Sequence, residues 1–346
     1  MSRTMMDTNR VTPHDSPEDS EPNSRPDSVL DSSLDSSAGP SFEDASADVK
    51  HGETRRESAL SPLAEIFVGP EGLYPGARWL IYLAMVFVAL GLLNSLYNGL
   101  RPEHVPLWWT MVGEFRMMLA AVLPGFIMAR IEGRPFGDFG LPAKRAFGRN
   151  FWVGAIWGFA SLSVLMLVLR ALGVFSFGAL DLHGARIFRF AFYYAVFFLI
   201  TGFFEDFLMR GYSQWVLTKG MNFWPAAAFL SLIFGALHLQ NPGEEKIGIA
   251  TVVVIGFFFC LTLRRTGTLW WAVGFHMAWD WGESFFYSVP DSGGVAPGHL
   301  LRASVHGPNW LTGGTVGPEG SWLVFVLLAA LWFLFSRAYP GVKYDG

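Results

Sequence analysis

The sequence predicts an all-α fold: a polytopic transmembrane helical bundle of about eight spans, preceded by a disordered N-terminal tail. Two observations carry this prediction. Hydrophobic residues make up 51% of the 346 residues and charged residues only 16%, whereas a soluble domain carries about 25% charged residues. From residue 76 onward the chain divides into apolar runs of roughly 20 residues, the length an α-helix needs to cross the hydrocarbon core. Such runs are too long and continuous for the strands of a membrane barrel.

The N-terminal segment differs from the rest of the chain in composition. Residues 1–70 are rich in Ser, Asp, Glu and Pro and contain few large apolar side chains. Such a segment cannot bury enough surface to offset the entropy lost on ordering, so it is predicted to be a disordered acidic tail. Much of the net charge of −4 comes from this tail. The chain has no basic surplus, so no nucleic-acid partner is predicted.

Eight apolar segments follow, and they define a predicted transmembrane protease domain at residues 76–340. Inside a bilayer every backbone polar group has to be paired within the protein, and a helix achieves this by itself. The predicted helical spans are 76–98, 106–130, 151–172, 186–209, 222–240, 247–263, 268–288 and 321–338.

The charges of the loops predict the orientation of the bundle. The linker 131–150 is basic, and short basic loops stay on the cytoplasmic side. With eight spans, Arg264, Arg265, Arg337 and Lys343 fall on the same side as this linker. The chain is therefore predicted to be a multi-pass integral membrane protein with a cytoplasmic N-terminus, in the cell membrane if the organism is a prokaryote.

Ionisable side chains interrupt the fourth predicted span, in FFEDFLMRGY. Each costs roughly 2.5–3.5 kcal/mol at the centre of a membrane helix, so each needs a reason. Asp206 and Arg210 are four residues apart and share a helix face, which predicts a structural ion pair. Glu205 points elsewhere and has no cationic partner on its own helix, which suits a general base. The simpler interpretation is a buried hydrogen-bond network of all three.

Two histidines lie on other predicted spans. His238 is at the end of the fifth, and His276 is inside the seventh. Asp280 follows His276 by four residues on the same helix face, which Glu283 extends. A carboxylate beside a histidine can fix its tautomer or face a reacting oxygen. Each histidine alone would be a packing residue, but with Glu205 they form a candidate water-activating site.

These stretches resemble, in order, the three motifs of the CPBP family of intramembrane metalloproteases, the group of the CAAX prenyl protease 2, Abi and lysostaphin-resistance-like proteins. All three fall within residues 200–285, the predicted motif core. The family usually has a second glutamate where this chain has Asp206, but at helical spacing the shorter side chain still reaches Arg210. The motif EExxxR is matched by Glu205, Asp206 and Arg210, FxxxH by Phe234 and His238, and the last motif by His276 with Asp280 four residues later.

The resemblance implies a role for each residue. Glu205 would activate the attacking water, and His238 and His276 would bind or polarise that water or stabilise the oxyanion. Asp280 would complete the oxyanion side or orient His276. Glu205, His238 and His276 could also hold zinc or another divalent metal with water as fourth ligand. Water activation by Glu205 without a metal is an equal alternative.

The function implied by the resemblance is that of a CAAX-protease-like intramembrane endopeptidase. Its partners would be a protein or peptide substrate, lipidated or not, and the lipid bilayer. Two alternatives stay open on the residues alone. The same polar side chains would serve a proton-coupled transporter, or a catalytically silent membrane scaffold could retain them.

Overall fold

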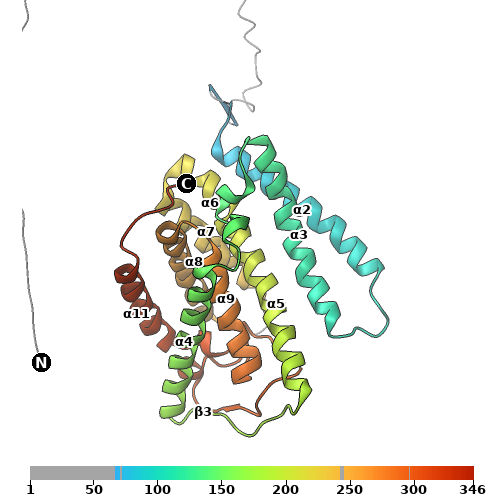
Figure 1. Ribbon diagram of the computed structural model, residues 1–346, viewed down its shortest axis with the longest axis vertical. Helices are drawn as coiled ribbons and strands as arrows, with labels where there is room; N and C mark the ends of the chain where they lie inside the picture. The colour runs from blue at the N-terminus through green and yellow to red at the C-terminus, as the bar shows by residue number, and fades with distance from the viewer. Residues whose placement is uncertain (1–66, 71, 242–244, 296) are drawn as a thin grey trace, which may run out of the picture. The chain divides into compact units, whose positions relative to one another are not determined.

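The computed structural model describes residues 67–70, 72–241, 245–295 and 297–346. The tail predicted at residues 1–70 therefore lies almost entirely outside the described residues. The described chain is a helical bundle, which confirms the all-α class (Figure 1). Its strands are two residues long and pair antiparallel, β1 (Val68–Gly69) with β2 (Gly72–Leu73) and β3 (Phe175–Ser176) with β4 (Ser304–Val305).

Each of the eight apolar segments contains a helix. The structure adds α6, which the sequence did not predict, directly after α5, and a short α10 in the loop before the last helix. A π-helix, η3 (Gly282–Tyr287), extends α9, and a 3-10 turn, η4 (Pro318–Gly320), precedes α11. The helices are α2 (Pro75–Gly99), α3 (Trp108–Ile131), α4 (Arg149–Ala171), α5 (Ala185–Arg210), α6 (Tyr212–Met221), α7 (Phe223–His238), α8 (Lys246–Thr266), α9 (Trp270–Trp281), α10 (Asn309–Thr312) and α11 (Leu323–Ala338). Two further 3-10 turns, η1 (Phe136–Phe139) and η2 (Ala143–Arg145), lie in the basic linker.

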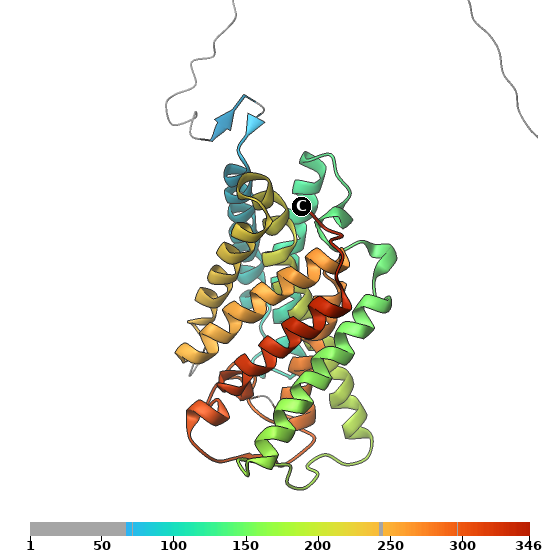
Figure 2. The same cartoon turned by 90° about the vertical axis from the view of Figure 1, so that its left-hand side faces the viewer.

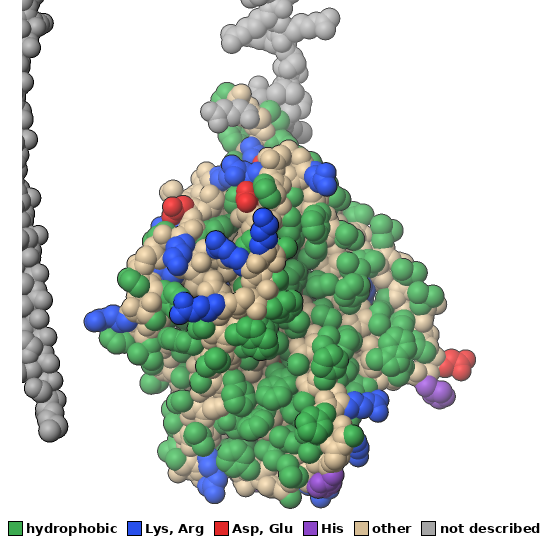
Figure 3. Space-filling model, in the orientation of Figure 1, with side chains coloured by type: hydrophobic (Ala, Val, Ile, Leu, Met, Phe, Trp, Pro, Cys, Tyr) green, Lys and Arg blue, Asp and Glu red, His purple; other side chains and the backbone are tan. Residues whose placement is uncertain are grey.

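Five helical segments are long and apolar enough to cross a membrane: α2, α3, α4, α8 and the continuous run of α5 and α6. Large apolar side chains are exposed along them, such as Phe87 and Phe188, which are 69% and 78% exposed. Figure 3 shows hydrophobic side chains over the middle of the molecule, with most Lys and Arg toward one end. An apolar surface of this kind requires lipid around it, so the protein is an integral membrane protein.

The other three apolar helices are shorter than a full span. With 16 residues, α7 is about 24 Å long, less than the roughly 30 Å of a hydrocarbon core. Its C-terminal end and the N-terminal end of α8 lie part-way along the bundle, well short of the end at which α4 leads into α5 (Figure 2). Because α7 ends at His238, this residue is held inside the bundle.

Helix α9 is buried against α4 by close backbone contact. A Cβ atom on Gly158 of α4 would overlap the carbonyl of Phe275, and one on Gly274 of α9 would overlap the carbonyl of Phe151. Small residues let membrane helices approach in this way, because packing rather than hydrophobicity drives their association. The close α4–α9 contact fixes the position of His276, which follows Phe275 directly and lies two residues after Gly274.

Candidate active site

Two consecutive acidic residues near the C-terminal end of α5 point to different surroundings. Asp206 is fully buried, and its Oδ1 accepts a hydrogen bond from Nη1 of Arg210 at 2.6 Å. Arg210 is 1% exposed and also donates from Nε to the carbonyl of Gly256 on α8 at 3.1 Å. Its guanidinium lies over the rings of Phe234 and Phe259, with 4.8 and 5.2 Å to the ring centroids. The ion pair therefore joins α5, α7 and α8.

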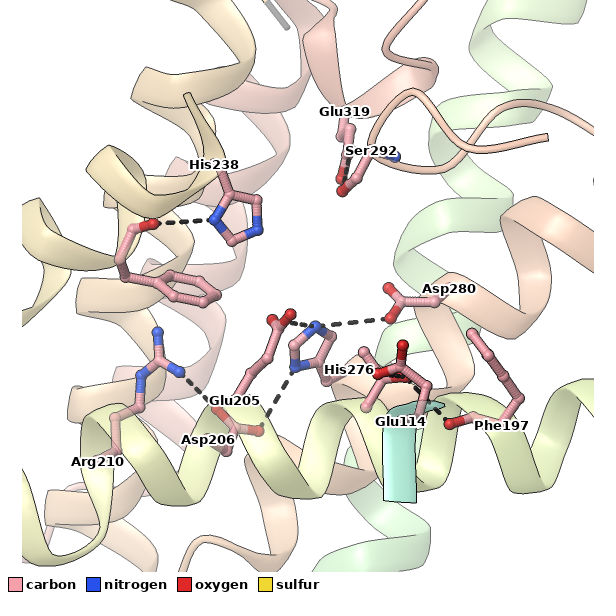
Figure 4. A network of polar contacts seen from close by, with 12 residues as sticks. Glu114, Phe197, Glu205, Asp206, Arg210, His238, His276, Asp280, Ser292 and Glu319 are labelled. Carbon is pink, nitrogen blue, oxygen red and sulfur yellow. Dashed lines mark hydrogen bonds and ion pairs between the residues drawn. The ribbon is translucent and has the colours of Figure 1, made fainter. Parts of the chain in front are cut away.

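Glu205 faces a cavity instead and meets His276 there (Figure 4). Its Oε2 lies 3.6 Å from Nε2 of His276, which is also 3.5 Å from Oδ2 of Asp280. On the other side of the ring, Nδ1 lies 3.7 Å from Oδ2 of Asp206. Both ring nitrogens thus face carboxylate oxygens, which accept hydrogen bonds, so His276 is arranged to donate from either side.

A glycine allows α5 and α9 to come this close. The Cβ that another residue would carry at Gly202 would lie 3.2 Å from the Cβ of His276. That distance is tight for a carbon contact, so a side chain at this position would push His276 away from Glu205. The glycine lies one turn before the acidic pair on the same helix, and it was not identified from the sequence.

His238 reaches the same cavity from α7. Its Nδ1 lies 2.9 Å from the carbonyl oxygen of Phe234, one turn earlier. A carbonyl can only accept a hydrogen bond, so Nδ1 carries the proton in the neutral ring and Nε2 is the acceptor. Figure 4 shows the ring of His238 facing across the open space toward Glu205 and Glu319. Its free nitrogen is therefore available to a bound molecule.

The cavity has a volume of about 900 Å³ and is lined mainly by apolar side chains. Its wall includes Phe87 of α2, Leu237 of α7 and Val295, which are 69%, 46% and 71% exposed. Because these side chains reach both the cavity and the outer surface, the cavity opens on the apolar side of the bundle. The four predicted catalytic residues, Glu205, His238, His276 and Asp280, all line it.

The structure adds acidic residues that sequence reasoning missed. Asp291 and Glu319, from the segment after α9, also line the cavity. Glu319 accepts hydrogen bonds from the backbone N–H and the hydroxyl of Ser292 at 2.7 and 2.8 Å, and Asp291 accepts one from Ser284 at 3.3 Å. Both residues lie in the Gly-rich loop 289–320. Nothing in its local sequence indicates that it folds back onto the helices.

Burial changes the acidity of these two loop carboxylates. It raises the pKa of Glu319, an effect that the hydrogen bonds from Ser292 and the nearby His238 and His276 oppose. Burial likewise raises the pKa of Asp291 well above its ordinary value, and the carboxylates of Asp280 and Glu319 add to the increase. The raised pKa values reflect the cost of bringing several negative charges into a buried place at the cavity.

Another missed carboxylate lies behind the site. Glu114 of α3 accepts a hydrogen bond from the hydroxyl of Thr201 at 3.2 Å, and Thr201 is one turn before Glu205 on α5. The sequence offered one signal for this residue, because Glu114 is an acidic side chain inside the second predicted span.

A metal site requires ligand atoms that converge on one point. Among the described residues, Glu283, Asp291 and Glu319 form such a set, with ligand atoms within 4.8 Å of one another. Glu205, His238 and His276 do not form one. Glu205 and His276 approach each other, but His238 stands across the cavity with Nδ1 committed to its own helix. The three metal candidates from the sequence therefore do not fit a preformed tridentate centre.

Comparison with known proteins agrees with the resemblance drawn from the motifs. Residues 187–282 match the family model described as type II CAAX prenyl endopeptidase Rce1-like. The matched segment runs from α5 to the beginning of η3 and contains all three motifs. The matched segment is shorter than the protease domain predicted at residues 76–340, since α2, α3, α4 and α11 lie outside the match. No curated protein and no solved structure matches the chain.

Proposed function

We propose that this protein is an intramembrane endopeptidase that hydrolyses a peptide bond in the cavity beside α5, α7 and α9. The observation that carries the proposal is the distance of 3.6 Å between Oε2 of Glu205 and Nε2 of His276. Both side chains line a cavity with largely apolar walls. A carboxylate and two imidazoles around an open space are the groups that water activation needs. The family match over residues 187–282 supports the same chemistry.

In the proposed reaction, Glu205 is the general base. A water molecule in the cavity attacks the carbonyl carbon of the substrate and gives its proton to Glu205. Nε2 of His238 accepts a hydrogen bond from the remaining O–H of this water and orients it, because Nδ1 already donates to the carbonyl of Phe234. Glu205 then passes the proton to the amide nitrogen as the C–N bond breaks. Proton transfers of this kind are worth about 10²–10⁴ in rate.

His276 and Asp280 take the oxyanion side. As the water attacks, the carbonyl oxygen of the substrate becomes negative and accepts a hydrogen bond from Nε2–H of His276. Oδ2 of Asp280 lies 3.5 Å from the same nitrogen, so Asp280 completes this side of the site. Donors fixed before the reaction stabilise developing charge without having to reorganise. The ion pair of Asp206 with Arg210 is assigned a positioning role, since Asp206 also faces Nδ1 of His276.

No step of this proposal runs through a metal ion. The sequence leaves zinc or another divalent metal at Glu205, His238 and His276 open, but these residues do not converge on one point. If such an ion is required, stringent chelation will abolish activity and a stoichiometric metal will be found in the purified enzyme. Activity that survives chelation supports direct activation of water by Glu205.

The proposed substrate is a protein or peptide with a long apolar group, either a lipid anchor or an apolar segment. The cavity walls are apolar and reach the outer surface at Phe87 and Leu237. An apolar chain can therefore enter from the lipid without crossing water, while the peptide bond meets Glu205. CAAX proteins carrying a prenyl group are one such class, which the name of the matched family indicates.

The deciding experiment compares protein termini in membranes from cells that express the wild type, Glu205→Gln or Glu103→Gln at matched levels. Glu103 lies on an exposed loop, so its variant controls for loss of a carboxylate. Termini present with the wild type and Glu103→Gln but absent with Glu205→Gln establish proteolysis and identify substrates.

Identical termini in all three membranes, with every protein folded, contradict the proposal. Flux measurements in vesicles then separate the two alternatives. A proton-coupled transporter would show flux that Glu205→Gln changes, whereas a silent scaffold would show none.

A further inference from the structure

A second polar site lies beside the proposed catalytic residues and takes no part in the proposed reaction. It is formed by Glu283 of η3, Asp291 of the following loop and Glu319 of η4, whose ligand oxygens lie within 4.8 Å of one another. The three residues come from three separate parts of the chain. In the described part of the molecule, none of them makes an ion pair with Lys, Arg or His.

The surroundings of Glu283 indicate that this cluster lacks a positively charged partner. Its side chain is 0% exposed. Trp279 approaches it, but neither of its carboxylate oxygens makes a hydrogen bond of normal geometry. The other two carboxylates are held in place, Asp291 by the hydroxyl of Ser284 and Glu319 by Ser292. An unpaired carboxylate is costly to bury, and the cost rises when two more lie next to it. A positive charge at the centre would satisfy all three.

The chemistry of the ligands selects the kind of cation. All three donors are carboxylates, and no His or Cys joins the set. Oxygen-only sites favour hard cations such as Ca²⁺ and Mg²⁺ over zinc. Ligands around Ca²⁺ lie about 2.3–2.6 Å from the ion, so opposite oxygens are up to about 5 Å apart, whereas Mg²⁺ requires about 4.2 Å. Ligand atoms that lie within 4.8 Å of one another can surround Ca²⁺.

We propose that Ca²⁺ binds between Glu283, Asp291 and Glu319 and fastens the loop 289–320 to the end of α9. Asp291 and Glu319 also line the cavity, so the ion would hold this part of the cavity wall in place. The site is distinct from the catalytic base, because Glu205 is not among its ligands. The ion would offset two of the three negative charges that Glu283, Asp291 and Glu319 bring together near Asp280.

The test uses the full chain, purified in detergent and stripped with EGTA, with Tb³⁺ as a luminescent substitute for Ca²⁺. Trp279 is close enough to Glu283 to transfer energy to a bound Tb³⁺. We expect one saturable Tb³⁺ site from which Ca²⁺ displaces the probe. At a hundredfold excess over Kd, Ca²⁺ should raise the Tm by about 5–10 °C, and Mg²⁺ should raise it less.

Four variants test whether the ion binds at these three carboxylates. Glu283→Gln and Glu319→Gln should lose Tb³⁺ luminescence and the Ca²⁺-dependent rise in Tm. Glu103→Gln should keep both, and so should Glu205→Gln, which separates this site from the catalytic residue. If Glu283→Gln fails to fold, Glu319→Gln and the wild type with and without EGTA still provide the test.

Four results would overturn the proposal. Absence of saturable Tb³⁺ binding and of a Ca²⁺ shift in the wild type would mean that the carboxylates share protons instead. Binding that persists in both Glu283→Gln and Glu319→Gln would put the ion elsewhere, and loss in Glu205→Gln alone would put it at the catalytic residues. A shift with Mg²⁺ and none with Ca²⁺ would reject Ca²⁺ as the ligand.

Discussion

Two regions of the bundle meet at the peptide bond between Glu205 and Asp206, and they are built on opposite principles. The anchor consists of Asp206, Arg210 and the carbonyl of Gly256, with contacts of 2.6 and 3.1 Å and side chains at most 1% exposed. The cavity site consists of Glu205, His238, His276 and Asp280. Its contacts with His276 are 3.5 and 3.6 Å, and the side chains of Glu205 and His276 are 22% and 15% exposed.

The difference in contact length and exposure matches a difference in role: the anchor holds the helices together, and the cavity site is arranged to react. A short charge-assisted hydrogen bond in a dry interior is strong, so the anchor can fix three helices in position. Contacts of 3.5 Å or more leave room for a water molecule, and catalytic contacts are often this loose before a substrate binds. The approach of Asp206 Oδ2 to Nδ1 of His276 at 3.7 Å links the two regions.

The largest effect should come from removing the base of the cavity site. Glu205→Gln keeps the size of the side chain but cannot take a proton, so activity on a membrane substrate should fall by about 10²–10⁴. The Tm should stay within a degree or two, because Glu205 is not part of the anchor. A fluorogenic peptide assay and a thermal scan on the same preparation measure both. Full activity in this variant would remove Glu205 from the proposed reaction.

The next effect is on stability and belongs to the anchor. Asp206→Ala leaves the guanidinium of Arg210 buried without a counter-ion, which should cost about 3–5 kcal/mol of unfolding free energy. Glu205→Ala should cost much less, since its side chain is 22% exposed and outside the ion pair. Denaturant unfolding in detergent measures both variants.

A double variant provides the control for this division of roles. Asp206→Ala combined with Arg210→Met removes both charges and should recover part of the lost stability. If Asp206→Ala and Glu205→Ala prove equally stable, the distinction between anchor and cavity site is wrong.

A smaller effect is expected at the packing surface that supports His276. Gly158→Ala puts a methyl group against the carbonyl of Phe275 and should cost about 1–3 kcal/mol, because α9 has to move away from α4. Activity should fall with it as His276 shifts. The matched control is Gly91→Ala in α2, where a Cβ meets no atom within 4 Å. Equal stability of the two variants would show that α4 and α9 tolerate separation.

The smallest effect concerns a surface ion pair far from both regions. Nε of Arg302 donates to Asp181 at 2.7 Å, and this hydrogen bond lowers the pKa of Asp181. A lowered pKa means that the pair adds stability above the ordinary Asp value of about 3.9 and loses it as the pH falls through the lower folded value.

Asp181→Asn should therefore reduce the Tm slightly at pH 7, and the difference from the wild type should vanish at strongly acidic pH. Thermal scans of the two proteins between pH 7 and the acid limit of folding measure this. A difference that grows on acidification would contradict the assigned sign.

The sequence by itself determined the helical class, the approximate positions of the apolar helices and the identity of the motif residues. These properties are local: the length of an apolar run predicts a helix in lipid, and a spacing of four residues puts Asp206 beside Arg210. Residues that act within one helix turn could therefore be assigned before the fold was known.

Only the tertiary structure decided which residues from different helices meet. The short α7 holds His238 inside the bundle, Gly202 admits His276 to within reach of Glu205, and the loop 289–320 brings Asp291 and Glu319 to the same cavity. None of these follows from periodicity, because each depends on how two distant segments pack. The cluster of Glu283, Asp291 and Glu319 is the clearest case, since its members are spread over three elements and become neighbours only when the chain is folded.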